Sequence, residues 1–135
     1  MMRVMDDDAA IYLSKALESL ATAESEFVHG RFNSCANRCY YACFQAAIAA
    51  LLWEGIRTSN DHWGHDFVHA QFVGQLVNRR KRYAADLRQV LVTNQALRDK
   101  ADYHTDLVTQ TQADRALGRC RTFVQAVRQG GGLDR

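Results

Sequence analysis

Apolar residues recur at every third or fourth position along most of the chain, which is the spacing of helices that bury one face. The first periodic stretch predicts a helix over about residues 7–29, and the acidic run Asp6–Asp8 suits its N-terminus. The second predicts a helix from Asn33 or Ser34 to Glu54 that is apolar on nearly every side. We therefore expect the second helix to form the centre of a bundle, with the other helices packed around it.

The middle of the chain predicts a loop followed by a shorter helix. Residues 56–64 are polar and interrupt the helical period, so they predict a loop. A third helix follows through Phe67 and Val77, and the basic run at residues 78–82 predicts a charged connector or a helix end. Proline, which would break a helix, is absent from the whole chain.

A fourth helix is predicted by an apolar stripe that runs from Tyr83 to Leu97. The stripe continues onto Arg98, so this arginine lies near the apolar face of its helix. A charge there is costly unless it has a partner or serves a functional site. Residues 102–111 are polar and weakly periodic, and a last amphipathic helix follows them and ends at the three glycines at residues 130–132. The pattern thus predicts five helices and no strand.

The length of 135 residues suits one compact domain and is too short for two. We predict a single all-α domain over residues 1–135, with an ordered core at about residues 7–129. The longest uncharged run, residues 39–53, is shorter than the ~20 residues that a membrane-spanning helix needs. The N-terminus has no apolar stretch with a cleavage site, so we expect a cytoplasmic protein without a membrane partner.

Charge is distributed unevenly, although the net charge is only +2. Residues 1–75 carry 5 basic and 9 acidic groups, whereas residues 76–135 carry 12 basic and 6 acidic groups. Such an asymmetry favours a surface that binds a polyanion. A basic helix face that is simply solvated explains the same asymmetry equally well.

Three of the four cysteines follow one another at four-residue steps, which places them side by side on one helix: Cys35, Cys39 and Cys43. We expect them to be reduced core residues. A zinc site shared with histidines of the third helix is the alternative, but no close-spaced pair of cysteines supports it. Capping and loop contacts are the expected role of the histidines around the start of that helix: His62, His65 and His69. We therefore predict no metal and no cofactor.

Arginine and histidine remain as residues that could carry chemistry, because the chain has no glycine-rich phosphate loop and no strand for a nucleophile elbow. An imidazole can take a proton from a ribose 2′-hydroxyl, and a guanidinium can hold the negative charge that develops on phosphorus. Together they can cleave RNA without a metal. Two pairs have a suitable spacing, Arg57 with His62 and Arg98 with His104.

Placement along the chain favours the second pair. Arg98 stands at the end of the apolar stripe of an amphipathic helix. The candidate supporting or substrate-binding residues follow it: Asp99, Asp102 and Tyr103. On an unbroken helix, residue 104 lies ~240° around the axis from residue 98. Arg98 and His104 can therefore face one site only if the helix ends or bends between them.

Four segments, in their order and spacing, resemble the HEPN family. They are Arg38–Ala47 (RCYYACFQAA), Leu51–Leu52, Gly64–His65 and Leu97–Tyr103 (LRDKADY). The resemblance covers about residues 8–129. Within the family, the chain is similar to one prokaryotic branch of small, single-domain HEPN proteins. It implies an up-and-down bundle of four to five helices that is commonly a homodimer.

The resemblance also implies a function, because many HEPN proteins are metal-independent ribonucleases that use an Arg-x(4–6)-His motif with a polar residue after the arginine. By position, Arg98 and His104 match this motif and Asp99 holds its polar position. His104 is then the general base and acid, Arg98 stabilises the phosphorane, and Asp99 and Tyr103 orient them or contact the RNA. The better-known toxins carry a tyrosine two residues after the histidine, where this chain has Asp106.

Many HEPN proteins are toxins encoded beside a minimal nucleotidyltransferase antitoxin, so the leading hypothesis is the ribonuclease toxin of such a pair. The first alternative is a non-catalytic HEPN module that binds a nucleotide, RNA or a nucleotidyltransferase partner. The second is a purely structural helical dimer. A purely structural role for the two residues is also open: Arg98 then forms an ion pair with Asp102, its i+4 neighbour, and His104 is a solvated loop residue.

Overall fold

The computed structural model describes residues 3–133, with side chains described for residues 7–130. All regular structure in this range is helical, which confirms the all-α prediction. The α-helices are α1 (Arg3–Val28), α2 (Phe32–Trp53), α3 (His65–Gln71), α4 (Val90–Tyr103) and α5 (Gln110–Leu133). A π-helix, η1 (Phe72–Arg79), continues α3, and a 3₁₀ turn, η2 (Ala85–Leu87), precedes α4.

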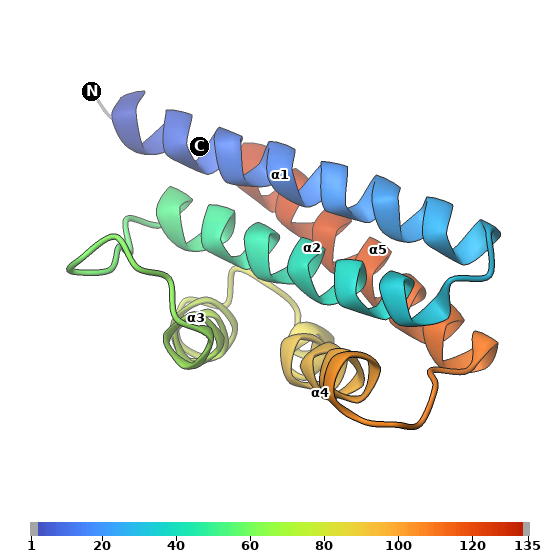
Figure 1. Ribbon diagram of the computed structural model, residues 1–135. Helices are drawn as coiled ribbons and strands as arrows, with labels where there is room; N and C mark the ends of the chain where they lie inside the picture. The colour runs from blue at the N-terminus through green and yellow to red at the C-terminus, as the bar shows by residue number, and fades with distance from the viewer. Residues whose placement is uncertain (1–2, 134–135) are drawn as a thin grey trace.

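Helix α2 is the centre of the bundle, as the sequence predicts. It packs against α1, α3, α4 and α5. Figure 1 shows α1 and α2 side by side with α5 behind them, while α3 and α4 lie on the other side of α2 and are seen almost end-on. Alanine and cysteine fill much of α2, so neighbouring helices approach it closely on several sides.

The cysteines are core residues, which confirms that part of the sequence prediction. Cys35, Cys39 and Cys43 of α2 and Cys120 of α5 are fully buried free thiols. The sulfur atoms of Cys35 and Cys39 are 3.9 Å apart. Hydrogen bonding to Cys120, followed by burial, raises the pKa of Cys39, so this thiol stays protonated.

The segment before α4 differs from the prediction of one helix from Tyr83 onward. Tyr83 and Leu87 are buried as the stripe implies, but α4 begins only at Val90. The backbone N–H groups of Arg82 and Tyr83 both donate to the carbonyl oxygen of Leu76, at 2.8 Å and 3.3 Å. These bonds tie the segment to η1 instead of to a helix of its own.

The end of α5 also differs from the prediction, because the helix continues through the glycines to Leu133. At Gly130, the side chain of Tyr83 lies close to the α5 backbone, which explains why a glycine occupies this position. A Cβ atom there would lie 2.9 Å from Cε1 of Tyr83. Gly130 is therefore a packing residue within the helix, not the signal that ends it.

Two classes of feature are absent from the part of the chain that the structure describes. No helix there combines the length and the apolarity needed to cross a membrane. Likewise, no group of three or more histidine, cysteine, aspartate or glutamate side chains in that part is placed to hold a metal ion.

Candidate functional site

Arg98 lies on the side of α4 that packs against α2, and its side chain is only 11% exposed. Its Nη1 donates to the hydroxyl oxygen of Tyr41 at 2.7 Å, and its Nη2 donates to Oδ1 of Asp99 at 2.7 Å. Its Nε lies 3.9 Å from Oδ2 of Asp102, within range of an ion pair but too far for a hydrogen bond. Burial opposes the charge, but the hydrogen bond to Asp99 and the proximity of Tyr41 raise the pKa of Arg98, which stays charged.

Three tyrosine rings surround the guanidinium of Arg98. Its central carbon lies 5.4 Å from the ring centre of Tyr40, 5.6 Å from that of Tyr41 and 5.7 Å from that of Tyr103. These distances are within the range of cation–π attraction. Tyr40 and Tyr41 belong to α2, so the tyrosine pair of the RCYYACFQAA segment is part of the site.

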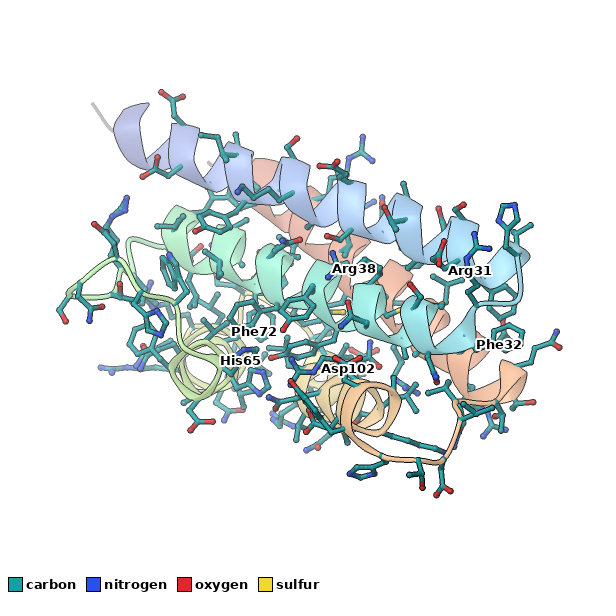
Figure 2. All side chains as sticks on the ribbon, in the orientation of Figure 1. Arg31, Phe32, Arg38, His65, Phe72 and Asp102 are labelled. Atoms are coloured by element: carbon teal, nitrogen blue, oxygen red, sulfur yellow. The ribbon has the colours of Figure 1, made fainter. Side chains whose placement is uncertain are left out.

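A polar chain extends from Asp102 across to α2 (Figure 2). Asn37 donates from Nδ2 to Oδ2 of Asp102 at 3.0 Å. The carbonyl oxygen of the Asn37 side chain accepts two hydrogen bonds from Arg38, at 3.0 Å and 2.8 Å. Asp102 therefore faces both Arg98 and Asn37, which holds the C-terminal half of α4 against α2.

His104 immediately follows the last residue of α4. Its backbone is extended, with φ −113° and ψ 161°. The helix is unbroken from Arg98 to Tyr103, and the backbone N–H of His104 still donates to the carbonyl oxygen of Lys100 at 3.3 Å, so no bend in α4 turns His104 towards Arg98. The imidazole is exposed and makes no hydrogen bond, ion pair or ring contact with any other described residue. The structure thus brings Arg98 together with Asp99, Asp102 and Tyr103, but not with His104.

A second cluster, missed by the sequence analysis, lies next to Arg98. The Tyr40 hydroxyl is 2.6 Å from Nδ1 of His65 and 2.8 Å from Nε2 of His69. A phenol carries one proton, so Tyr40 donates to one imidazole and accepts an N–H from the other. The His65 ring also stacks on Phe44, with ring centres 4.7 Å apart.

Burial determines the charge of this cluster. It lowers the pKa of His65, with the charge of Arg98 acting in the same direction, and it lowers the pKa of His69. Burial also raises the pKa of Tyr40. The expected capping and loop role is wrong for His65 and His69, because both rings contact the Tyr40 hydroxyl. Their spacing of four residues places them on one helix face, and this spacing is the signal that could have revealed a shared partner.

A family model for the HEPN domain matches residues 9–130 of the chain. The chain belongs to the HEPN family. No curated protein matches it. The family match covers α2, α3, α4 and nearly all of α5, so the HEPN domain contains every residue of the candidate site.

The other arginine–histidine pair of this HEPN domain lies in an unremarkable setting. Arg57 is exposed in the loop after α2 and forms an ion pair with Asp8. His62 is exposed, and its backbone N–H donates to Oδ1 of Asn60 at 3.1 Å, a loop contact of the kind predicted. Arg57 and His62 therefore provide a matched control for Arg98 and His104.

Proposed function

We propose that this HEPN protein is a metal-independent endoribonuclease. The observation that carries the proposal is the placement of Arg98. A charged guanidinium is held by three tyrosine rings and two carboxylates, and an exposed His104 follows directly where α4 ends. A fixed positive charge and an accessible imidazole near the C-terminal end of one helix are the two groups that phosphodiester cleavage without a metal requires.

In the proposed reaction His104 takes the proton from a ribose 2′-hydroxyl, and the 2′-oxygen attacks the adjacent phosphorus. Arg98 stabilises the negative charge of the phosphorane. The bond from phosphorus to the 5′-oxygen then breaks, and the imidazolium returns the proton to that oxygen. The products are a 2′,3′-cyclic phosphate and a free 5′-hydroxyl.

Supporting roles follow from the contacts of the neighbouring residues. Asp99 and Asp102 orient the guanidinium through its Nη2 and Nε sides. Tyr103 is 72% exposed and its ring contacts Arg98, so an RNA base can stack on the exposed part of the ring. Asp99, Asp102 and Tyr103 are thus positioning or binding residues in this proposal.

The biological setting belongs to the same proposal. We infer a cytoplasmic homodimer that is the toxin of a pair with a minimal nucleotidyltransferase antitoxin. The HEPN match supports the inference through what many family members do, and the buried free thiols suit a reducing compartment. The reading frame next to the gene is the direct check on the antitoxin.

The test is cleavage of single-stranded RNA by the purified protein in EDTA. We expect cutting that leaves 2′,3′-cyclic phosphate ends, whereas DNA of the same sequence survives because it lacks the 2′-hydroxyl. H104A should lower the rate by at least a hundredfold. R98K should do the same, because lysine keeps the charge but loses the planar fork that meets Tyr41 and Asp99.

R57A and H62A are the controls, because they remove the same residue types at a similar spacing from an exposed loop. Both should cut at the parent rate. The ribonuclease proposal fails if pure parent protein leaves RNA intact, or if H104A cuts as fast as the parent while H62A does not.

A second candidate function is a non-catalytic module that binds RNA, a nucleotide or a nucleotidyltransferase partner. Its supporting observation is that Nη1 and Nη2 of Arg98 already donate to Tyr41 and Asp99, while the Asp102 carboxylate lies 3.9 Å from Nε. In addition, none of the described side chains orients the His104 imidazole. Binding of RNA at low salt without any cleavage would favour this candidate over the ribonuclease.

A further inference from the structure

Two arginines without an acidic partner line a groove between α4 and α5, apart from the Arg98 site. Arg115 and Arg119 lie one turn apart on α5 and border two cavities, of about 520 Å³ and about 320 Å³. No acidic side chain lines the smaller cavity, where Thr93 and Gln112 supply further polar groups. The larger cavity also touches Asp86, an exposed residue.

Arg119 is fixed in place by a buried amide. Its Nε donates to Oδ1 of Asn94 at 2.8 Å, and Asn94 is only 1% exposed. The Asn94 amide is itself anchored, because its Nδ2 donates to the carbonyl oxygen of Ala116 at 3.4 Å. The two terminal nitrogens of Arg119 make no hydrogen bond or ion pair within residues 7–130, so they remain available to a ligand.

The electrostatics of this groove are unbalanced. Burial, with the neighbouring charge of Arg115 acting in the same direction, lowers the pKa of Arg119. Arg115 has neither a hydrogen bond nor an ion pair among the described side chains. Lys100 adds a third positive charge beside the groove, where its Nζ donates to Oε1 of Gln112 at 3.1 Å. Because the partly buried charge of Arg119 has no counter-ion among the described residues and lies near Arg115, an anion in the groove would stabilise the folded protein.

We propose that Arg115 and Arg119 form a binding site for backbone phosphates of single-stranded RNA. A guanidinium binds phosphate oxygens through two parallel N–H groups, and Nη1 and Nη2 of Arg119 are free for this contact. The two arginines are offset by ~6 Å along α5, so they can follow a strand instead of closing on one small ion. The choice of RNA rests on the proposed ribonuclease function.

The groove lies on a different side of α4 from the Arg98 site. Thr93 and Leu97 line it next to α5, whereas Arg98 faces the tyrosines of α2. Bound phosphates at Arg115 and Arg119 would therefore lie away from the bond that is cut. The site should increase the affinity for RNA without changing the chemical step.

The experiment measures binding of a fluorescent, unstructured 12-nucleotide RNA by anisotropy at several salt concentrations. The background is the full chain carrying H104A, so that the RNA stays intact. R115Q and R119Q should each weaken binding about five- to tenfold and lower the slope of log K against log salt by about 0.7 per lost phosphate contact. Arg128, exposed on the same helix, supplies the control: R128Q should change binding less than twofold.

Two features make the result decisive. Arg115 is exposed and makes no hydrogen bond or ion pair with the described residues, so R115Q tests the site even if R119Q disturbs Asn94. In the cleaving parent, R115Q should raise KM at unchanged kcat, because the site acts on binding alone.

The outcomes separate this site from the ribonuclease proposal. If R115Q and R119Q bind RNA with the affinity and salt slope of R128Q, the phosphate site is wrong, whether or not the protein cuts RNA. The absence of any RNA binding at 50 mM salt also overturns it. If the parent never cuts RNA but both variants weaken binding as stated, the site stands and only the ribonuclease proposal is lost.

Discussion

Tyr40 connects the interior of the bundle with the candidate site. Its ring faces the guanidinium of Arg98, while its hydroxyl lies between His65 and His69. Tyr40 is fully buried, so both histidines are held close to the core by a group that cannot turn to water. Changes in the protonation of the histidines should therefore affect the stability of the fold around Arg98.

The first prediction concerns acid. Because the pKa of His65 and of His69 is lowered in the folded protein, the unfolded chain binds more protons than the folded chain below the ordinary histidine pKa of about 6.5. Stability from the neutral imidazoles is present above about pH 6.5 and is lost as the pH falls towards the lower folded values. Urea unfolding at pH 7.5 and at pH 5.5 measures the difference.

The matched variant for this prediction is the double substitution H65Q and H69Q. Glutamine keeps a hydrogen-bonding side chain but does not titrate in this range. The variant should therefore lose less stability than the parent between the two pH values. An equal loss in parent and variant would show that other groups cause the pH dependence.

The second prediction compares two glycines of α5. Gly130 faces Tyr83, where a Cβ would lie 2.9 Å from the ring, whereas a Cβ at Gly118 would meet no atom within 4 Å. G130A should destabilise the protein by about 1–2 kcal/mol because the buried ring must move. G118A should stabilise it by up to about 1 kcal/mol, since alanine is the better helix residue. Denaturant unfolding of both variants checks the opposite signs, and G130A as stable as the parent would contradict the close packing.

At the scale of elements, the start of α5 shows a reciprocal pair of caps that its sequence already contains. The backbone N–H of Gln112 donates to Oγ1 of Thr109 at 3.1 Å, and the backbone N–H of Thr109 donates to Oε1 of Gln112 at 3.0 Å. This is the Thr-x-x-Gln form of the capping box. It fixes where α5 begins, directly after the polar loop that follows His104.

The third prediction tests this cap. T109A removes the hydroxyl that accepts the N–H of Gln112, so it should lower the free energy of unfolding by about 1 kcal/mol. Thr111 lies two residues later, is exposed and makes no side-chain hydrogen bond with the described residues. T111A should therefore change stability by less than about 0.5 kcal/mol. Urea unfolding decides, and equal effects of the two substitutions would exclude the capping role.

At the scale of the whole molecule, ion pairs neutralise part of the excess positive charge that residues 76–135 carry. Arg80 and Arg82 both pair with Glu54, and Arg121 pairs with Glu24. These acids come from the first half of the chain, so the fold neutralises part of the surplus. Among the described residues, neither Arg115 nor Arg119 has an acidic partner, so their positive charge can attract an anion.

The fourth prediction concerns assembly. One arginine and one histidine offer limited stabilisation of a phosphorane, and the family resemblance implies two such pairs facing each other across a two-fold axis. Light scattering at tens of micromolar should give the mass of two 15.3 kDa chains for the parent and for H104A alike. A monomeric mass would exclude a site in which the Arg98 and His104 pairs of two chains face each other.

Much of the fold could be predicted from the sequence, because helix periodicity is a local property. The apolar character of α2 on all sides predicted a central helix with buried cysteines, and both predictions are confirmed. The apolar stripe of the fourth helix placed Arg98 near the protein interior, where the structure has it. The polar segment after Ala101 allowed the helix to end before His104, and α4 ends at Tyr103.

Other features depend on pairs of residues far apart in the chain, so periodicity could not predict them. Tyr40 meets His65 and His69 only because α3 packs on α2. Arg119 is positioned by Asn94, which the pattern treats as one position of an apolar stripe. Local spacing determined which residues form helices and which helix faces are buried. The packing of those helices decided which polar groups share a site, because a hydrogen bond needs atoms within about 3 Å whatever their separation in sequence.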